Sequence, residues 1–201
     1  MEQLYAGFQE PGAAFRAKPF WSWNGDLKKE ELIRQIHVMK EMGFGGYFMH
    51  SRTGLKTEYL GEKWFDLTNA CADEGEKLGM ESWLYDEDRW PSGTAGGVVC
   101  KNPLYRAKYL HISIIEAKAF QWNDNILAAF SGEVDGLNCL NYQRISRSTP
   151  VAEFKNKSII VFNVVDRQED SFFNGYTDVD RLNKDATLEF IRLTHEKYMD
   201  K

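Results

Sequence analysis

Residues 80–93 read MESWLYDEDRWPSG, and our interpretation of the whole chain is built outward from this stretch. It begins as an apolar segment typical of a buried strand and ends in three consecutive acids, Asp86, Glu87 and Asp88. An arginine, a tryptophan and a Pro-Ser-Gly turn follow. Adjacent carboxylates repel one another, so folding alone gains little from placing three of them at a strand end. A site that binds or protonates a polar ligand would gain from it.

The same layout occurs earlier in the chain. One amphipathic helical pattern ends at Gly43 and a second ends at Gly79, and each leads into a short apolar run typical of a buried strand. A short aromatic strand, residues 18–24, precedes the first helix. The apolar stripes of the two helices consist of Leu32, Ile36 and Met39, and of Trp64, Leu67, Thr68, Cys71, Gly75 and Leu78. This alternation predicts an α/β fold with parallel strands joined by right-handed crossovers.

The pattern changes after Gly97. Residues 109–116 alternate with a period of about two, residues 126–130 form a short apolar run, and residues 157–165 are strongly β-like. Turns and polar patches separate these runs, which predicts a small antiparallel β module inserted after the third strand. The last segment returns to a helical period, with Asn183 as its N-cap. Its predicted apolar stripe consists of Leu188, Ile191, His195 and Tyr198.

The carboxyl ends of parallel strands meet at one edge of a sheet, and α/β folds bind their ligands there. Each predicted strand of the repeat has polar or aromatic residues at that end. We expect a ligand site formed by Trp23, Asn24, His50, Arg52, Tyr85, Asp86, Glu87, Asp88 and Trp90.

Several of these residues also have a structural interpretation. Trp23 could offer a flat surface to a ligand, or it could share the core with Trp21, which lies on the same face of the strand. His50 could bind the ligand or be a core histidine, and Arg52 could hold a carboxylate of the protein or of the ligand. His50 and Ser51 do not form a base–nucleophile pair, because adjacent strand residues point to opposite faces.

The acidic triplet has three interpretations. One carboxylate, of Asp86 or Glu87, contacts the substrate or transfers a proton. Alternatively, the three oxygen-rich side chains bind a hard cation such as Ca²⁺. In the third interpretation the acids only cap the following turn and pair with Arg89.

Composition narrows the class of protein. The net charge of −5 and the lack of a long basic run argue against a nucleic-acid partner. No signal peptide and no apolar run long enough to span a membrane is present in the sequence, so we expect a cytoplasmic protein. Cys71, Cys100 and Cys139 are odd in number and far apart, which predicts free thiols rather than a metal site or disulfides. Six Trp residues suit a core or a cleft for sugar rings.

Three ordered motifs resemble a known family. Residues 18–24 (KPFWSWN), 43–52 (GFGGYFMHSR) and 83–93 (WLYDEDRWPSG) are similar to the N-terminal part of α-L-rhamnosidase-like proteins of glycoside hydrolase family 106. Residues 175–183 (GYTDVDRLN) and 190–198 (FIRLTHEKY) look like the later segment that leads into the third barrel helix of that family. The β module matches only in outline.

The resemblance implies a fold. It implies the first three βα units of a (β/α)₈ TIM-type barrel in residues 1–104, the inserted β-rich module in residues 105–166, and a return loop with the third barrel helix in residues 167–201. A complete barrel needs roughly 250 residues, so the third strand would have an open edge. We expect self-association through that edge or an ordered covering of it.

The resemblance also implies a function. Such enzymes cleave a glycosidic bond with two carboxyl groups, one of which protonates the leaving oxygen while the other activates water. The catalytic pair is expected largely beyond this chain, so we predict the N-terminal portion of a glycoside hydrolase that binds a carbohydrate. No cofactor is required, and Ca²⁺ remains an option. The alternatives are a non-catalytic carbohydrate-binding or structural fragment and a metal-using barrel enzyme.

Overall fold

The structure is a computed structural model that describes residues 2–201. The chain divides into two compact units. The first unit comprises the residues up to Tyr105 together with Glu169–Lys201, and the second comprises Arg106–Gln168.

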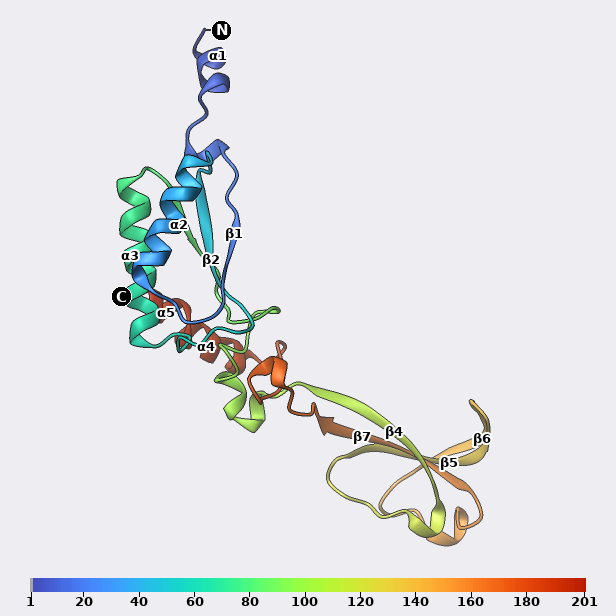
Figure 1. Cartoon of the computed structure of the whole chain (residues 1–201). Helices are drawn as coiled ribbons and strands as arrows, with labels where there is room; N and C mark the ends of the chain where they lie inside the picture. Colours follow the sequence, from blue (N-terminus) through green and yellow to red (C-terminus); the bar gives the residue numbers. More distant parts are fainter. Residues whose placement is uncertain (1) are drawn as a thin grey trace. The chain divides into compact units, whose positions relative to one another are not determined.

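A three-stranded sheet forms the centre of the first unit (Figure 1). Its strands are β1 (Phe20–Trp23), β2 (Gly46–Ser51) and β3 (Glu81–Leu84), in the order β1-β2-β3. Both neighbouring pairs are parallel. The parallel pairing that the helix–strand alternation predicts is therefore confirmed.

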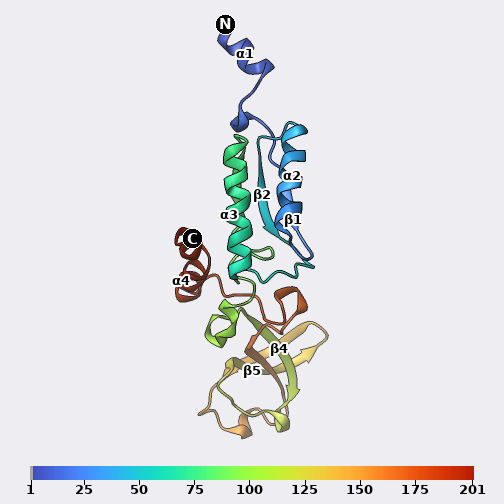
Figure 2. The same cartoon turned by 60° about the vertical axis from the view of Figure 1, so that its left-hand side comes forward.

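Two helices connect these strands and cover one face of the sheet, where α3 lies beside β2 (Figure 2). Helix α2 (Lys29–Glu41) buries Leu32, Ile36 and Met39, and helix α3 (Glu62–Lys77) buries most of its predicted stripe. Tyr47 and Met49 of β2 complete this core. Gly43 and Gly79 follow the two helices with φ values of +85° and +61°, which only glycine adopts without strain.

The opposite face of the sheet is open. Phe20 and Trp83, which flank Phe48 in register, are 53% and 46% exposed. β1 and β3 are both edge strands among the described residues, whereas a barrel needs each strand to pair on both sides and curve. The predicted partial (β/α)₈ TIM barrel is therefore wrong. The molecule has an open parallel sheet and a separate antiparallel sheet.

Helix α4 (Lys184–Leu193) packs on a second hydrophobic cluster of the first unit, whereas Tyr198 of the last helix packs on the first core. Helix α4 starts as predicted, because the Asn183 side chain accepts hydrogen bonds from the first turn. The buried stripe differs from the predicted one: Ala186, Phe190 and Leu193 face the cluster, while Leu188 is 52% exposed. The chain then bends at Thr194 before the short helix α5 (His195–Met199). The cluster consists of Ala95, Val99, Cys100, Val179, Ala186, Phe190 and Leu193.

The second unit is a four-stranded antiparallel sheet of order β4-β7-β5-β6. Its strands are β4 (Lys108–Glu116), β5 (Ile126–Asp135), β6 (Asn138–Ile145) and β7 (Ser158–Asp166). The sequence did not indicate β6, because nearly all of its residues are exposed and polar residues interrupt any apolar alternation. One face carries the core, which includes Ile145, Ile159 and Val161.

Short elements complete the chain. Helix α1 (Glu2–Gln9) precedes the first sheet. The 3₁₀ segments are η1 (Ala13–Phe15), η2 (Val99–Lys101), η3 (Pro103–Tyr105), η4 (Ala117–Ala119), η5 (Val151–Glu153) and η6 (Ser171–Phe173). Within residues 2–201, no helix combines the length and apolar character needed to cross a membrane.

Candidate functional site

The three parallel strands bring their carboxyl ends together, as the sequence predicts. The Arg52 N–H donates to the Trp23 carbonyl at 3.1 Å, and the Tyr85 N–H donates to the Met49 carbonyl at 3.3 Å. Ser51, the last residue of β2, donates its hydroxyl hydrogen bond to the Asp88 carboxylate. The acidic triplet after β3 is thus anchored to the end of β2.

Glu87 is the centre of the loop that follows β3. Its side chain is fully buried, and both carboxylate oxygens accept hydrogen bonds from the surrounding backbone. Five backbone N–H groups and one hydroxyl donate to it over 2.7–3.1 Å: the N–H groups of Asp88, Gly93, Thr94, Ala95 and Gly96, and the Thr94 hydroxyl. Burial raises the pKa of Glu87, and the N–H groups of Gly96, Asp88 and Thr94 oppose this rise. Both carboxylate oxygens of Glu87 therefore accept hydrogen bonds from the loop that carries it.

Asp88 connects two distant segments of the first unit. One of its oxygens accepts from Ser51, and the other accepts from the Asn174 amide at 2.8 Å. Arg89 lies 3.4 Å from the same carboxylate and donates to the carbonyls of Ser171 and Phe172. The pairing with Arg89 expected in the structural interpretation of the triplet is present, and Asp88 is 5% exposed.

Asp86 differs from its two neighbours because its side chain is 40% exposed. One oxygen accepts a hydrogen bond of 2.6 Å from the Ser92 hydroxyl. The other lies 3.7 Å from Nε2 of His195, whose Nδ1 is 2.9 Å from the Thr194 hydroxyl. Of the two acids considered for catalysis, Asp86 has the carboxylate that reaches solvent.

His195 was missed by sequence reasoning, which placed it on the apolar stripe of the last helix. The bend at Thr194 instead directs its ring toward Asp86. No sequence motif links the two residues, because they lie on segments that meet only through folding. A helix end predicted just before His195 could have drawn attention to it. The residues Thr194 and His195 do not give a recognisable signal for a helix end.

His50 is held within the aromatic face of the sheet. Its ring contacts Phe20 and Tyr85, with centroid distances of 4.3 Å and 4.0 Å, and these two rings also contact each other. It is 1% exposed, and neither ring nitrogen has a hydrogen-bond partner among the described residues. Burial, followed by the charge of Arg52, lowers the pKa of His50 to about 4, and the charge of Asp88 partly opposes the shift. His50 is therefore a neutral aromatic ring of the sheet at neutral pH.

The remaining candidates divide between core and surface. Trp23 is 1% exposed and packs edge-on against Trp21 and Trp64, so its ring belongs to the core rather than to a ligand platform. Tyr85 is half-buried, and burial raises its pKa. The exposed candidates are Asn24, Arg52 and Trp90, of which Trp90 is 69% exposed.

The three acids do not converge on one point. Asp86 bonds Ser92, Glu87 bonds its own loop, and Asp88 bonds Ser51 and Asn174. Across residues 2–201, no group of three or more His, Cys, Asp or Glu side chains is arranged to hold a metal ion.

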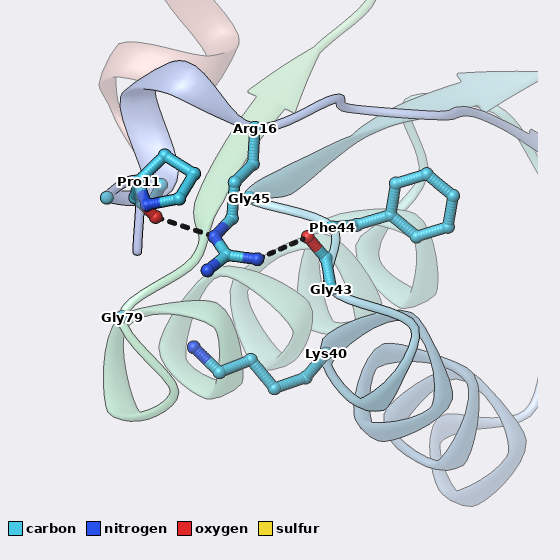
Figure 3. Close-up of a pocket in the computed structure, with 9 residues that line it drawn as sticks. Pro11, Arg16, Lys40, Gly43, Phe44, Gly45 and Gly79 are labelled. Carbon is cyan, nitrogen blue, oxygen red and sulfur yellow. Dashed lines mark hydrogen bonds between the residues drawn. The ribbon is translucent and has the colours of Figure 1, made fainter. Parts of the chain in front are cut away.

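A pocket of about 370 Å³ lies at the opposite end of the sheet and has a structural explanation (Figure 3). The Arg16 guanidinium donates to the Pro11 carbonyl at 2.7 Å and to the Gly43 carbonyl at 3.2 Å. Lys40 extends along the same pocket. Cations at helix C-termini satisfy free carbonyls and oppose the helix dipole, so Arg16 fastens the lead-in segment to the end of α2.

Comparison with known proteins gives distant matches. No family model matches the chain. The chain is 23% identical over 124 residues to a putative beta-glucuronidase of Formosa agariphila, a match that covers 59% of this chain and 11% of that protein. A rhamnosidase structure from Novosphingobium sp. PP1Y aligns with a TM-score of 0.43 and 22% identity over 65% of this chain and 12% of that one. The chain spans about a tenth of the length of the proteins that it matches.

Proposed function

We propose that this chain is a segment of a glycoside hydrolase-like protein that binds a carbohydrate at the joined ends of β1, β2 and β3. The observation that carries the proposal is the carboxylate of Asp86, which is open to solvent and oriented by Ser92 and His195. The sequence similarity to a putative beta-glucuronidase and the family resemblance of the strand-end motifs support a glycoside as the ligand.

In this proposal the three acids of the triplet have different roles. Glu87 shapes the loop, Asp88 ties it to Ser51 and Asn174, and Asp86 presents its carboxylate to the ligand. The hydrogen bonds of Glu87 and Asp88 hold the loop that carries Asp86 in place. Proton transfer to a bound substrate requires such positioning of the reacting group. Glu87 and Asp88 are thus positioning residues for Asp86.

The surroundings of Asp86 suit a sugar. Trp90 offers an exposed ring on which the apolar face of a pyranose could stack, and Asn24 and Arg52 supply exposed hydrogen-bond donors from the ends of β1 and β2. Glycoside hydrolysis uses two carboxyl groups. We assign to Asp86 the proton transfer to the leaving oxygen, and we assign no residue to the second role.

Binding of methyl glycosides tests this proposal. The ¹H–¹⁵N spectrum of the 201-residue chain is recorded with methyl β-D-glucuronide and with methyl α-L-rhamnoside at millimolar concentrations. We expect shifts of the Trp90 indole N–H and of the Asp86 amide, and we expect Trp90→Ala to abolish the shift of the Asp86 amide. His111→Ala, which changes an exposed residue of the second unit, is the matched control. Shifts that are absent for both sugars would contradict the proposal.

A non-catalytic carbohydrate-binding segment is the second candidate. The observation that favours it is that the oxygens of Glu87 and Asp88 accept hydrogen bonds from the protein itself. An aryl glycoside assay separates the candidates, because turnover that is lost in Asp86→Asn supports a catalytic role. Binding without turnover supports the second candidate.

We also propose that the open face of the first sheet is covered by a second copy of the chain. Phe20 and Trp83 expose large aromatic surfaces there, and β3 has an unpaired edge among the described residues. Edge strands with apolar surroundings pair readily with another chain.

A further inference from the structure

A second pocket of the first unit lies between the turn after β3 and helix α4, and the proposed function does not use it. Its volume is about 250 Å³. Val179, Ala186 and Phe190 form its apolar wall, and all three belong to the second hydrophobic cluster. The pocket is therefore an indentation that leads from the surface into a packed core.

The charged residue of this pocket is neutralised within the protein. Arg181 donates to both oxygens of Asp178, at 2.8 Å and 3.1 Å. It also donates to the carbonyls of Ser92 and Pro91, at 3.0 Å and 3.3 Å. Arg181 makes four hydrogen bonds within the protein and its charge is matched by the Asp178 carboxylate, so the pocket suits an uncharged ligand better than an anionic one.

Polar groups border one side of the pocket. Ser92, which lines it, donates to Asp86 at 2.6 Å. Phe190, which also lines it, packs edge-on against the His195 ring at a centroid distance of 5.6 Å. Asp86 and His195 are themselves 3.7 Å apart. The carboxylate–imidazole pair thus adjoins the pocket through two of its lining residues.

The volume limits the size of the ligand. An apolar protein cavity of about 150 Å³ holds a benzene molecule, whereas sites for drug-sized ligands begin at about 300 Å³. A pocket of about 250 Å³ accordingly has room for one ring with a small substituent.

We propose that this pocket binds an uncharged single-ring alcohol or phenol, with the ring against Phe190 and Ala186 and the hydroxyl directed to the Ser92 oxygen. The ring gains from burial against the apolar wall, and the ligand hydroxyl donates to the Ser92 oxygen, whose own hydrogen is donated to Asp86. This binding is independent of glycoside recognition.

The test is a titration of the 201-residue chain with phenol, followed through the methyl signals of Val179 and Ala186. We expect saturable shifts with a dissociation constant on the order of 1 mM, as suits a ligand with so few atoms. Benzoate has the same ring but a negative charge, which loses its hydration in the pocket and meets an Arg181 that is already paired with Asp178. We expect benzoate to bind at least about tenfold more weakly than phenol.

Two variants at an exposed position of α4 control the titration. Thr187 lines the pocket and is exposed, so Thr187→Phe places a ring in the opening. It should weaken phenol binding by about tenfold or more, while Thr187→Ser should bind as the wild type does. Unmoved methyl signals, equal binding of benzoate, or unchanged affinity in a folded Thr187→Phe variant would each overturn the proposal. Trp90 signals report glycoside binding separately, so the two proposals fail independently.

Discussion

The Oε2 atom of Glu87 lies 2.7 Å from the backbone nitrogen of Thr94, and this hydrogen bond is one of six that enclose the Glu87 carboxylate. Consecutive N–H groups that converge on an anion form a nest, which is how loops of this kind bind phosphate or carboxylate. Here the anion is a side chain of the protein. The loop that carries Asp86 is therefore organised around an internal carboxylate.

We expect Glu87→Gln to destabilise the protein by about 2–4 kcal/mol, because the new amide group turns a donor toward backbone N–H groups that need an acceptor. Urea unfolding measures this loss. Glu76→Gln changes an exposed acid on α3 and should alter the free energy of unfolding by less than about 0.5 kcal/mol. Equal stabilities of the two variants would show that the nest contributes nothing.

His50 should make the protein sensitive to mild acid. Its pKa in the folded protein is lowered to about 4, so the unfolded chain binds the proton first as the pH falls below about 6.5. Stability is thus complete above pH 6.5 and is lost as the pH falls toward 4, by about 3 kcal/mol in total.

His50→Phe removes this titration and retains an aromatic ring in contact with Phe20 and Tyr85. We expect the free energy of unfolding of the variant to fall less between pH 6.5 and 4 than that of the wild type. His111→Phe, at an exposed position of the second unit, should leave the pH dependence unchanged. Parallel pH curves for wild type and His50→Phe would contradict the prediction.

Gly97 is required by a close approach as well as by its backbone conformation. Its φ is +95°, and a Cβ atom there would lie 2.5 Å from Cδ2 of Tyr176 and 2.8 Å from the Phe173 carbonyl oxygen. Gly97→Ala should cost more than about 2 kcal/mol in thermal or urea unfolding. Gly175 has a φ of +81° and no atom within 4 Å of such a Cβ, so Gly175→Ala should cost about 1 kcal/mol.

The open sheet face predicts a dimer that depends on Trp83. Sedimentation velocity should detect self-association of the wild type, and Trp83→Lys should shift the population to monomers by placing a charge on the apolar face. Trp90→Lys, which lies outside the sheet, is the control. A wild-type monomer with rapid amide exchange throughout β3 would rule out the covering of this face by a second copy.

The parts of the fold that local patterns control could be predicted from the sequence. Leu32, Ile36 and Met39 repeat at helical spacing and are buried together, and the run from Gly46 to Ser51 forms a strand that the helices cover on one face. Asn183 caps its helix through its own side chain. Each of these features depends on neighbours within a few residues.

Local sequence patterns did not decide whether the parallel sheet closes into a barrel. Three βα-like segments fit both a piece of a barrel and an open sheet, because local periodicity does not state whether an edge strand finds a further partner. The buried face of α4 likewise depended on where Val99 and Val179 would lie. Leu188 is as apolar as Phe190, and packing alone selected the latter.

The candidate site shows the same division. The sequence by itself determined that Asp86, Glu87 and Asp88 would stand at the end of a strand beside the ends of its parallel neighbours, because alternation and helix stops follow from local chemistry. Only the tertiary structure decided their roles. The backbone from Gly93 to Gly96 folds onto Glu87, Asn174 reaches Asp88, and the bend at Thr194 brings His195 to Asp86. Identical residue types thus acquire different exposure and partners, because these depend on segments that meet only when the chain has folded.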